Sequence, residues 1–202
     1  EISACLVGSE MCIRDSHDAD LAMLAGTGWR TLMLAKAESA AQVDGVVAAL
    51  GPQTRVVALC ETAAGILAAA ELAAHPHVGA LMWGAEDLVA SMGGSSSRTP
   101  EGAYRSVVQH ARATVLLAAA AHGAAAWDAV HLDLGDEAGL AAEAEDAAAL
   151  GCTATVCLHP RQVPVVRSAY TPAPEAVERA RRVLAAAEGR RGAFALDGAM
   201  VD

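Results

Sequence analysis

Residues 55–62 read RVVALCET, and residues 78–87 read VGALMWGAED. Each stretch is an almost unbroken apolar run of strand length that ends in acidic residues. Short apolar runs without alternation are typical of strands in a parallel sheet, which are covered on both faces. An alanine-rich segment suited to a helix separates the two runs, so together they predict a strand–helix–strand unit.

Further runs of the same kind extend this pattern in both directions along the chain. We expect five strands, at Thr31–Ala35, Arg55–Cys60, Val78–Trp83, Ala129–Leu134 and Thr153–Leu158. The predicted helices are Ser39–Leu50, Ala64–Ala74, Pro100–His122 and Asp136–Leu150, followed by Gln162–Ala169 and, after a TPAPE break, Pro174–Glu188. Five strand–helix repeats predict a parallel α/β sheet with right-handed crossovers.

The composition fits this architecture and excludes several classes of protein. Hydrophobic residues, alanine above all, make up 54% of the 202 residues, and the formal net charge is −10. Without a basic stripe, no nucleic-acid partner is expected. No uncharged apolar run approaches the roughly 20 residues of a membrane span, so no membrane partner is expected either. The five cysteines form neither a disulfide framework nor a C-x-x-C site, which indicates a reduced, cytoplasmic protein.

The first 16 residues, EISACLVGSEMCIRDS, differ from the rest of the chain. They lack helical and strand periodicity, and they do not have the layout of a signal peptide. We interpret residues 1–16 as a leader that is either disordered or not native, because the string looks like translated sequencing-adaptor DNA. Residues 17–172 are expected to form the main domain, and residues 173–202 a helix and tail of the same domain.

Ionisable residues lie near or just after the ends of all five predicted strands. The carboxyl ends of parallel strands meet at one edge of a sheet, which is where α/β folds bind their ligands. We therefore predict an active site at this edge. The residues concerned are Lys36 and Glu38, Glu61, Glu86 and Asp87, Asp133, and His159.

Two of these carboxylates, Glu61 and Asp87, follow neighbouring strands. Adjacent strands lie about 4.8 Å apart, so both side chains can reach one cation. Carboxylate oxygens favour Mg²⁺, with Mn²⁺ as an alternative. A second interpretation stays open, because acidic residues also begin helices, where the helix dipole stabilises them. Beside them, the Gly84–Asp87 turn offers backbone N–H groups suited to a carboxylate.

Four motifs, in this order, resemble the citrate lyase β-subunit-like group of the HpcH/HpaI aldolase superfamily. They are ETAAG at residues 61–65, WGAEDL at 83–88, LHPRQ at 158–162 and DGAMVD at 197–202. The resemblance implies a (βα)8 TIM barrel, of which about five C-terminal βα units are present, plus a C-terminal helical extension. Since the first three strands of such a barrel are not among the five, we expect this chain alone to be inactive.

The resemblance also implies an activity and an assembly. Such relatives are magnesium-dependent carbon–carbon lyases of 3-hydroxyacyl-CoA thioesters, of the malyl-CoA or citramalyl-CoA type. They release an acyl-CoA and a 2-oxo acid, and they are usually homotrimers that exchange C-terminal tails between subunits.

The same resemblance assigns roles to residues of this chain by position. Glu61 and Asp87 would bind the metal, and Asp202 would be the acid–base residue, donated by the tail to a neighbouring subunit's site. Backbone amides after the third strand would hold the 2-oxo acid, and the turn after the fifth strand would lie near the CoA thioester. The substrate-binding residues implied are Glu61, Gly84, Ala85, Glu86, His159 and Pro160.

Two other functions stay open at this point. A partial barrel can serve as a non-catalytic binding or regulatory subunit, and a class II aldolase would act on free 2-oxo acids without CoA. A dinucleotide-binding enzyme, a P-loop protein and a serine hydrolase are not indicated, because no G-x-G-x-x-G, P-loop or G-x-S-x-G motif follows a strand.

Overall fold

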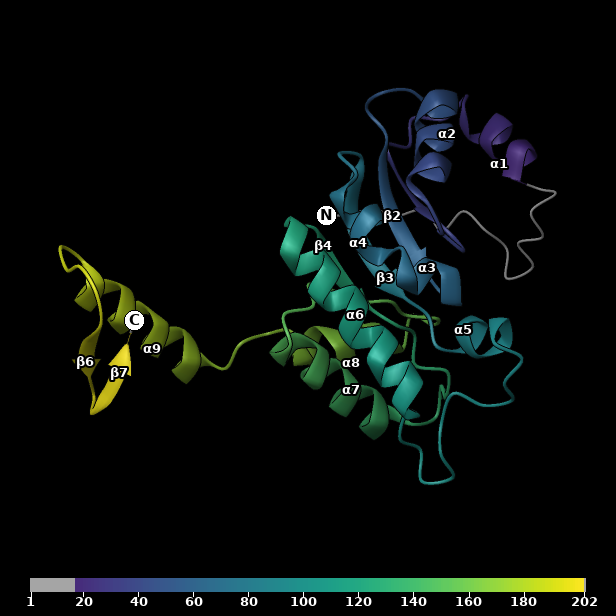
Figure 1. The fold of residues 1–202 in the computed structure, drawn as a ribbon. Coiled ribbons are helices and arrows are strands. Elements are labelled where there is room, and N and C mark those ends of the chain that lie inside the picture. The colour runs from purple at the N-terminus through teal and green to yellow at the C-terminus, as the bar shows by residue number, and fades with distance from the viewer. Residues whose placement is uncertain (1–16, 202) are drawn as a thin grey trace.

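The fold is built on a parallel sheet. The computed structural model describes residues 17–201, so the leader expected at residues 1–16 and the acid–base residue expected at Asp202 lie outside the described residues. The sheet has five strands in the order β1-β2-β3-β4-β5, and every pair is parallel (Figure 1). The predicted parallel α/β sheet is therefore confirmed. The strands are β1 Thr31–Leu34, β2 Arg55–Cys60, β3 Val78–Trp83, β4 Ala125–Asp128 and β5 Ala154–Thr155.

Helices cover one face of this sheet. The main core lies between the strands and helices α2 to α7, around fully buried side chains such as Leu72, Leu81 and Trp83. The opposite face carries a smaller apolar cluster made by strand residues and by loops that follow them, including Met33 and Met82. Sequential strand order with helices on one face is the pattern of (βα) barrels, whereas doubly wound sheets carry helices on both faces. The helices are α1 His17–Leu24, α2 Ala40–Leu50, α3 Ala63–Leu67, α4 Ala69–Ala74, α5 Glu86–Ser91, α6 Ser106–His122, α7 Glu137–Ala149, α8 Gln162–Ala169 and α9 Pro174–Ala187.

Local sequence signals explain where several helices begin and end. Ser39 precedes α2 as predicted, and its backbone N–H donates to the Gln42 side chain over 3.1 Å. This contact satisfies a donor that the first helical turn leaves unpaired. Gly123 ends α6 in the left-handed conformation, with φ 70°, which glycine adopts without a steric penalty.

One predicted strand is wrong. Residues 129–134 form a loop, and the fourth strand is instead β4 at Ala125–Asp128. Because Gly123 ends α6, the chain enters the sheet at once, and Trp127 pairs with Met82. The alanines of β4 have the composition of the preceding helix, which hides this strand in the sequence.

Two predicted helices also differ from the structure. The helix expected over Pro100–His122 begins only at Ser106, because residues before it form an antiparallel bridge between Arg98 and Tyr104. The helix expected over Ala64–Ala74 is divided at Ala68 into α3 and α4.

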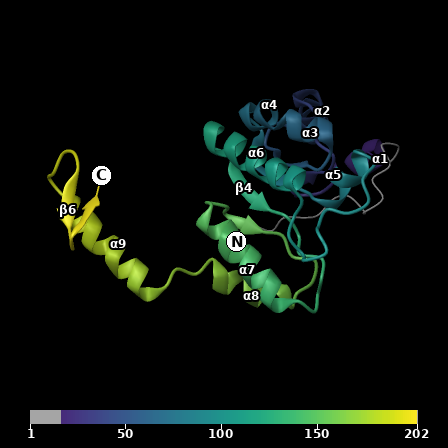
Figure 2. The same ribbon diagram turned by 60° about the horizontal axis from the view of Figure 1, so that its bottom comes forward.

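The last part of the chain forms an arm that projects away from the sheet. This C-terminal arm consists of α9 and the antiparallel hairpin of β6, Phe194–Leu196, and β7, Ala199–Val201 (Figures 1 and 2). No residue of α9 is buried. The hairpin was not predicted, although Asp197 and Gly198 have φ of 51° and 77°, as a two-residue Asp-Gly turn requires.

Candidate metal and substrate site

A pocket of about 450 Å³ opens at the carboxyl edge of the sheet. Its apolar lining comes largely from the smaller cluster on the helix-free face of the strands, with Met33, Leu59 and Met82 among its members. Charged and polar residues surround this apolar surface. They are Lys36, Glu61, Glu86, Asp87, Arg98 and Tyr104. The predicted position of the site, at the carboxyl ends of the strands, agrees with this pocket.

Glu61 is the most buried carboxylate of the pocket. It follows β2 directly and is only 8% exposed. The backbone N–H of Lys36, at the end of β1, donates to its Oε1 over 3.1 Å. Gly84, at the end of β3, leaves room for the side chain, because a Cβ there would lie 2.9 Å from the Glu61 Cβ. Residues from three adjacent strand ends therefore fix this carboxylate in place.

Asp87 lies at the same edge, in the first turn of α5. Its Oδ2 is 3.3 Å from the ammonium nitrogen of Lys36, and both side chains are partly exposed. Glu61 and Asp87, the carboxylate pair, thus both contact one lysine, which binds the first through its main chain and the second through its side chain.

The carboxylate pair is electrostatically unfavourable without a cation. Burial, followed by the charge of Asp87, raises the pKa of Glu61 from 4.5 to about 7, although the N–H and charge of Lys36 act to lower it. Burial, followed by the charge of Glu61, also raises the pKa of the Cys60 thiol to about 12, so Cys60 stays neutral. A positive charge between the carboxylates favours their ionised form.

The donor set fits a hard divalent cation. Two carboxylates supply oxygen ligands only, as Mg²⁺ prefers, and this ion keeps several coordination positions for water or substrate oxygens. Among residues 17–201, no group of three or more His, Cys, Asp or Glu side chains is placed to hold a metal. A closed structural zinc site, which needs four protein ligands, is therefore not formed by the described residues.

The turn after β3 brings three of the predicted substrate-binding residues into the pocket. Gly84, Ala85 and Glu86 all line it. The backbone N–H of Gly84, however, donates to the Cys60 carbonyl over 3.2 Å as part of the sheet. The side chain of Glu86 accepts a hydrogen bond from the Ser97 hydroxyl. Glu86 therefore holds the loop before α6 with its side chain.

Two residues of the segment after β5 that were expected at the substrate, His159 and Pro160, lie outside the pocket lining. Leu158, which precedes them, lines the pocket. The His159 Nδ1 accepts the Arg161 N–H over 3.1 Å, and the Gln162 side chain accepts the Leu158 N–H over 2.8 Å. These bonds shape the turn itself, so the expected role of His159 and Pro160 beside a thioester stays a proposal.

Sequence reasoning missed one group of pocket residues. The Arg98 guanidinium lies 3.8 Å above the Tyr104 ring and contacts the Glu143 carboxylate over 2.6 Å. The same Glu143 carboxylate lies 2.8 Å from the Nδ1 of buried His131. Arg98 lies in a glycine- and serine-rich loop, and no spacing in the sequence links it to Glu143 on α7.

Together the fold and the pocket define a class: α/β proteins of the parallel (βα) type whose carboxyl edge presents paired carboxylates to a ligand. The chain matches the family model described as HpcH/HpaI aldolase/citrate lyase over residues 14–160. The chain belongs to this family. No helix within residues 17–201 has the length and apolar character needed to cross a bilayer.

Two relatives illustrate this membership. The chain is 58% identical over 183 residues to the citrate lyase subunit beta-like protein of Mycobacterium tuberculosis, covering 91% of this chain and 65% of that protein. It is 35% identical over 188 residues to a (3S)-malyl-CoA thioesterase of Cereibacter sphaeroides, covering 91% and 64%. The chain thus spans slightly less than two thirds of the length of each relative.

A solved structure shows the same fold. The crystal structure of CitE from Mycobacterium tuberculosis in complex with magnesium, acetoacetate and coenzyme A matches with a TM-score of 0.83 at 53% sequence identity. The match covers 98% of this chain and 71% of that chain.

Proposed function

We propose that this chain carries the metal-binding part of the active site of a carbon–carbon lyase that acts on 3-hydroxyacyl-CoA thioesters of the malyl-CoA or citramalyl-CoA type. The observation that carries the proposal is the carboxylate pair, which two neighbouring strands of a parallel sheet bring to one pocket. The magnesium, acetoacetate and coenzyme A bound to the CitE relative support both the ion and the substrate class.

In this proposal, Glu61 and Asp87 hold Mg²⁺, with Mn²⁺ as a substitute. The ion supplies Lewis acidity that stabilises negative charge on a substrate oxygen. The 3-hydroxyl group loses its proton and becomes the carbonyl of the 2-oxo acid. The bond between carbons 2 and 3 breaks, and its electron pair stays on carbon 2 of the acyl-CoA, which then takes up a proton.

The remaining residues bind and orient the substrate. Backbone N–H groups of Ala85 and Glu86 at the start of α5 are proposed to hold the carboxylate of the 2-oxo acid, since a helix start favours an anion. The turn with His159 and Pro160 is proposed to lie along the thioester arm. Holding both fragments in line reduces the entropic part of the activation barrier of the cleavage reaction.

The assembly is proposed to be a homotrimer in which the C-terminal arm of one subunit reaches the site of another. Residues 17–172 would then form a (βα)8-type barrel segment, and residues 173–202 the exchanged tail. Asp202 would move the proton at carbon 2 of the acyl-CoA in the neighbouring site. The exposure of the arm supports this assignment, because Leu184 is 72% and Met200 is 76% exposed.

The test uses malyl-CoA and citramalyl-CoA with a protein that joins this chain to the first three strands of the barrel, because the chain alone is expected to be inactive. Acetyl-CoA together with glyoxylate or pyruvate is the expected product pair, and EDTA should abolish its formation until Mg²⁺ is restored. Glu61→Gln should abolish it as well, whereas Glu145→Gln, which neutralises an exposed carboxylate of α7, should not. Failure of the wild-type chain to bind a divalent cation would overturn the proposal.

A second candidate is hydrolysis of the thioester, which the name of the Cereibacter sphaeroides relative favours. Both reactions start from malyl-CoA, but they differ in products. Hydrolysis releases free CoA thiol together with malate, whereas the lyase releases acetyl-CoA and glyoxylate. A thiol reagent and a 2-oxo acid assay, applied to the same sample, therefore separate the two.

A further inference from the structure

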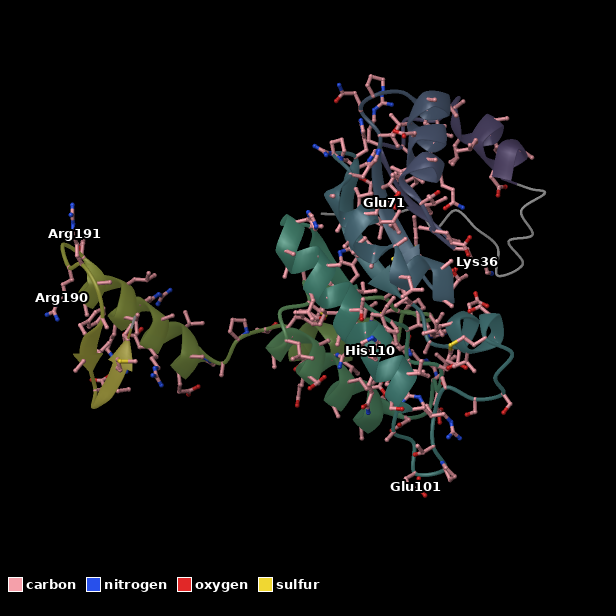
Figure 3. The ribbon with its side chains drawn as sticks, viewed as in Figure 1. Lys36, Glu71, Glu101, His110, Arg190 and Arg191 are labelled. Atoms are coloured by element: carbon pink, nitrogen blue, oxygen red, sulfur yellow. The ribbon has the colours of Figure 1, made fainter. Side chains whose placement is uncertain are left out.

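Lys36 is the only lysine in the chain. The other 13 of its 14 Lys and Arg residues are arginine. The single lysine lies at the end of β1 (Figure 3), and it lines the pocket. Lysine presents a compact ammonium on a flexible stem, whereas arginine presents a rigid planar fork suited to fixed paired contacts. The single ammonium side chain of the chain thus lies at the carboxylate pair.

The backbone of Lys36 is held in an uncommon conformation. Its φ is 50°, in the left-handed region that side chains other than Gly, Asn and Asp rarely adopt. In this conformation its N–H donates to Glu61 Oε1, and the next N–H, that of Ala37, donates to the Leu59 carbonyl over 3.0 Å. Strained backbone of this kind is concentrated at functional sites.

The side chain of Lys36 forms an ion pair with Asp87, the other carboxylate, that another cation can replace. The Lys36 Nζ and Asp87 Oδ2 are 3.3 Å apart, and the two side chains are 38% and 47% exposed. Ion pairs this open to solvent contribute little to stability. A divalent cation, with twice the charge, therefore competes effectively for Asp87.

The second cation of the pocket is placed differently. Arg98 is stacked on Tyr104 and bound to Glu143, so its guanidinium is held by contacts within the pocket wall. A Lys36 ammonium displaced from Asp87 by a divalent cation would lie beside the Gly84–Asp87 turn, where the proposed function places the carboxylate of the 2-oxo acid.

We propose that Lys36 is an exchangeable counter-ion. In the cation-free protein its ammonium neutralises Asp87 while its main chain positions Glu61. When a divalent cation binds the carboxylate pair, the ammonium leaves Asp87 and binds the carboxylate of the 2-oxo acid. This inference rests on the proposed function and adds a positioning and substrate-binding residue to it.

The proposal predicts that loss of the Lys36 ammonium raises the affinity for the metal and lowers the affinity for the 2-oxo acid. Removing the ammonium removes a competitor of the metal and a repulsive charge beside it, so Lys36→Met should bind Mn²⁺ more tightly, on the order of tenfold. The same variant lacks the charge that binds the acid. Its affinity for pyruvate at saturating Mg²⁺ should fall, also on the order of tenfold. If Lys36 had a purely structural role, Lys36→Met would weaken the binding of both Mn²⁺ and pyruvate.

The experiment measures the Mn²⁺ dissociation constant by electron paramagnetic resonance and that of pyruvate by calorimetry at saturating Mg²⁺. Lys36→Arg keeps the charge and should keep the wild-type Mn²⁺ affinity. Arg167→Met removes an exposed charge from α8 and should change neither constant. Weaker or unchanged Mn²⁺ binding in Lys36→Met would overturn the proposal.

A second measurement uses the wild-type chain, in case Lys36→Met does not fold. Reductive ¹³C-methylation keeps the charge of the ammonium, and the single lysine gives one side-chain resonance apart from the N-terminal amine. We expect this resonance to shift on addition of Mg²⁺ and again on addition of pyruvate. A resonance that ignores Mg²⁺, in a chain shown to bind it, would overturn the role of Lys36 alone. A wild-type chain that binds no divalent cation would overturn the proposed function as well.

Discussion

Gly84 and Glu61 are in contact across two neighbouring strand ends. A Cβ atom on Gly84 would lie 2.9 Å from the Cβ of Glu61 and 3.2 Å from its Oε2. The first distance is shorter than side chains tolerate, and it involves the stem of the glutamate and not its mobile end. The absence of a side chain at Gly84 therefore fixes where the Glu61 carboxylate lies.

Gly84→Ala should displace the Glu61 carboxylate and weaken divalent-cation binding. Overpacking of this kind also costs about 1–3 kcal/mol of unfolding free energy. Gly79→Ala is the matched control, because Gly79 lies in the same strand and a Cβ there meets nothing within 4 Å. Mn²⁺ titration and urea denaturation of both variants measure the two effects. Equal Mn²⁺ affinity in both would show that Gly84 does not set the position of Glu61.

Cation binding should strengthen as the pH rises through about 7. The pKa of Glu61 is raised to about 7 by burial and by Asp87, with Lys36 opposing, so at pH 6 most Glu61 carries a proton that a cation must displace. Mn²⁺ dissociation constants measured from pH 6 to pH 8 should fall across this interval. A flat profile would contradict the raised pKa.

The raised pKa of Glu61 also makes stability depend on pH, but in the opposite direction to cation binding. The folded chain holds the Glu61 proton up to about pH 7, whereas the unfolded chain releases it near 4.5, so between these values the folded state binds more protons. Stability of the cation-free chain should therefore fall as the pH rises from about 4.5 to about 7. Glu61→Gln should remove this part of the pH dependence in thermal melts, and Glu145→Gln should retain it.

The buried end of β4 should be a stability determinant. Asp128 is 4% exposed, and it accepts the Trp83 indole N–H over 2.7 Å and the Arg112 Nε–H over 3.0 Å. Asp128→Ala leaves both donors without this partner and should cost about 3 kcal/mol. Asp146→Ala removes the exposed partner of Arg112 and should cost less than about 1 kcal/mol. Similar losses for both variants, in urea titrations, would contradict the role of burial.

Part of this site could be predicted from the sequence because it follows from strand order. Glu61 and Asp87 each follow an apolar run, and parallel strands bring such residues to one edge whatever the details of packing. The contacts of Arg98 with Glu143 and of Trp83 with Asp128 depend on how helices and loops pack. No periodicity in the sequence carries that information.

The errors in secondary structure have a physical cause as well. The sequence predicts a strand at Ala129–Leu134 and not at Ala125–Asp128, because alanine-rich strand residues resemble the end of the preceding helix α6. Tertiary pairing with β3 overrides the helix propensity of these alanines. The Asp197-Gly198 hairpin turn had a local signal, which was interpreted only as part of a family motif.

The C-terminal arm should be dispensable for the stability of the sheet domain but required for assembly. The three hydrophobic clusters of the described chain contain no residue beyond Tyr170, and no residue of α9 is buried. Deletion of residues 173–202 should therefore change the free energy of unfolding of the remaining domain by less than about 1 kcal/mol, as for changes outside a core. Under the proposed trimer it should also reduce the assembly to monomers in light scattering.

Leu184→Asp tests the same surface at full length, because it places a charge on an apolar side chain that is 72% exposed. It should lower the assembled fraction without lowering the melting temperature of the isolated domain. An unfolded deletion variant would show that the arm belongs to the core, and an unchanged mass in both variants would contradict exchange of the arm between subunits.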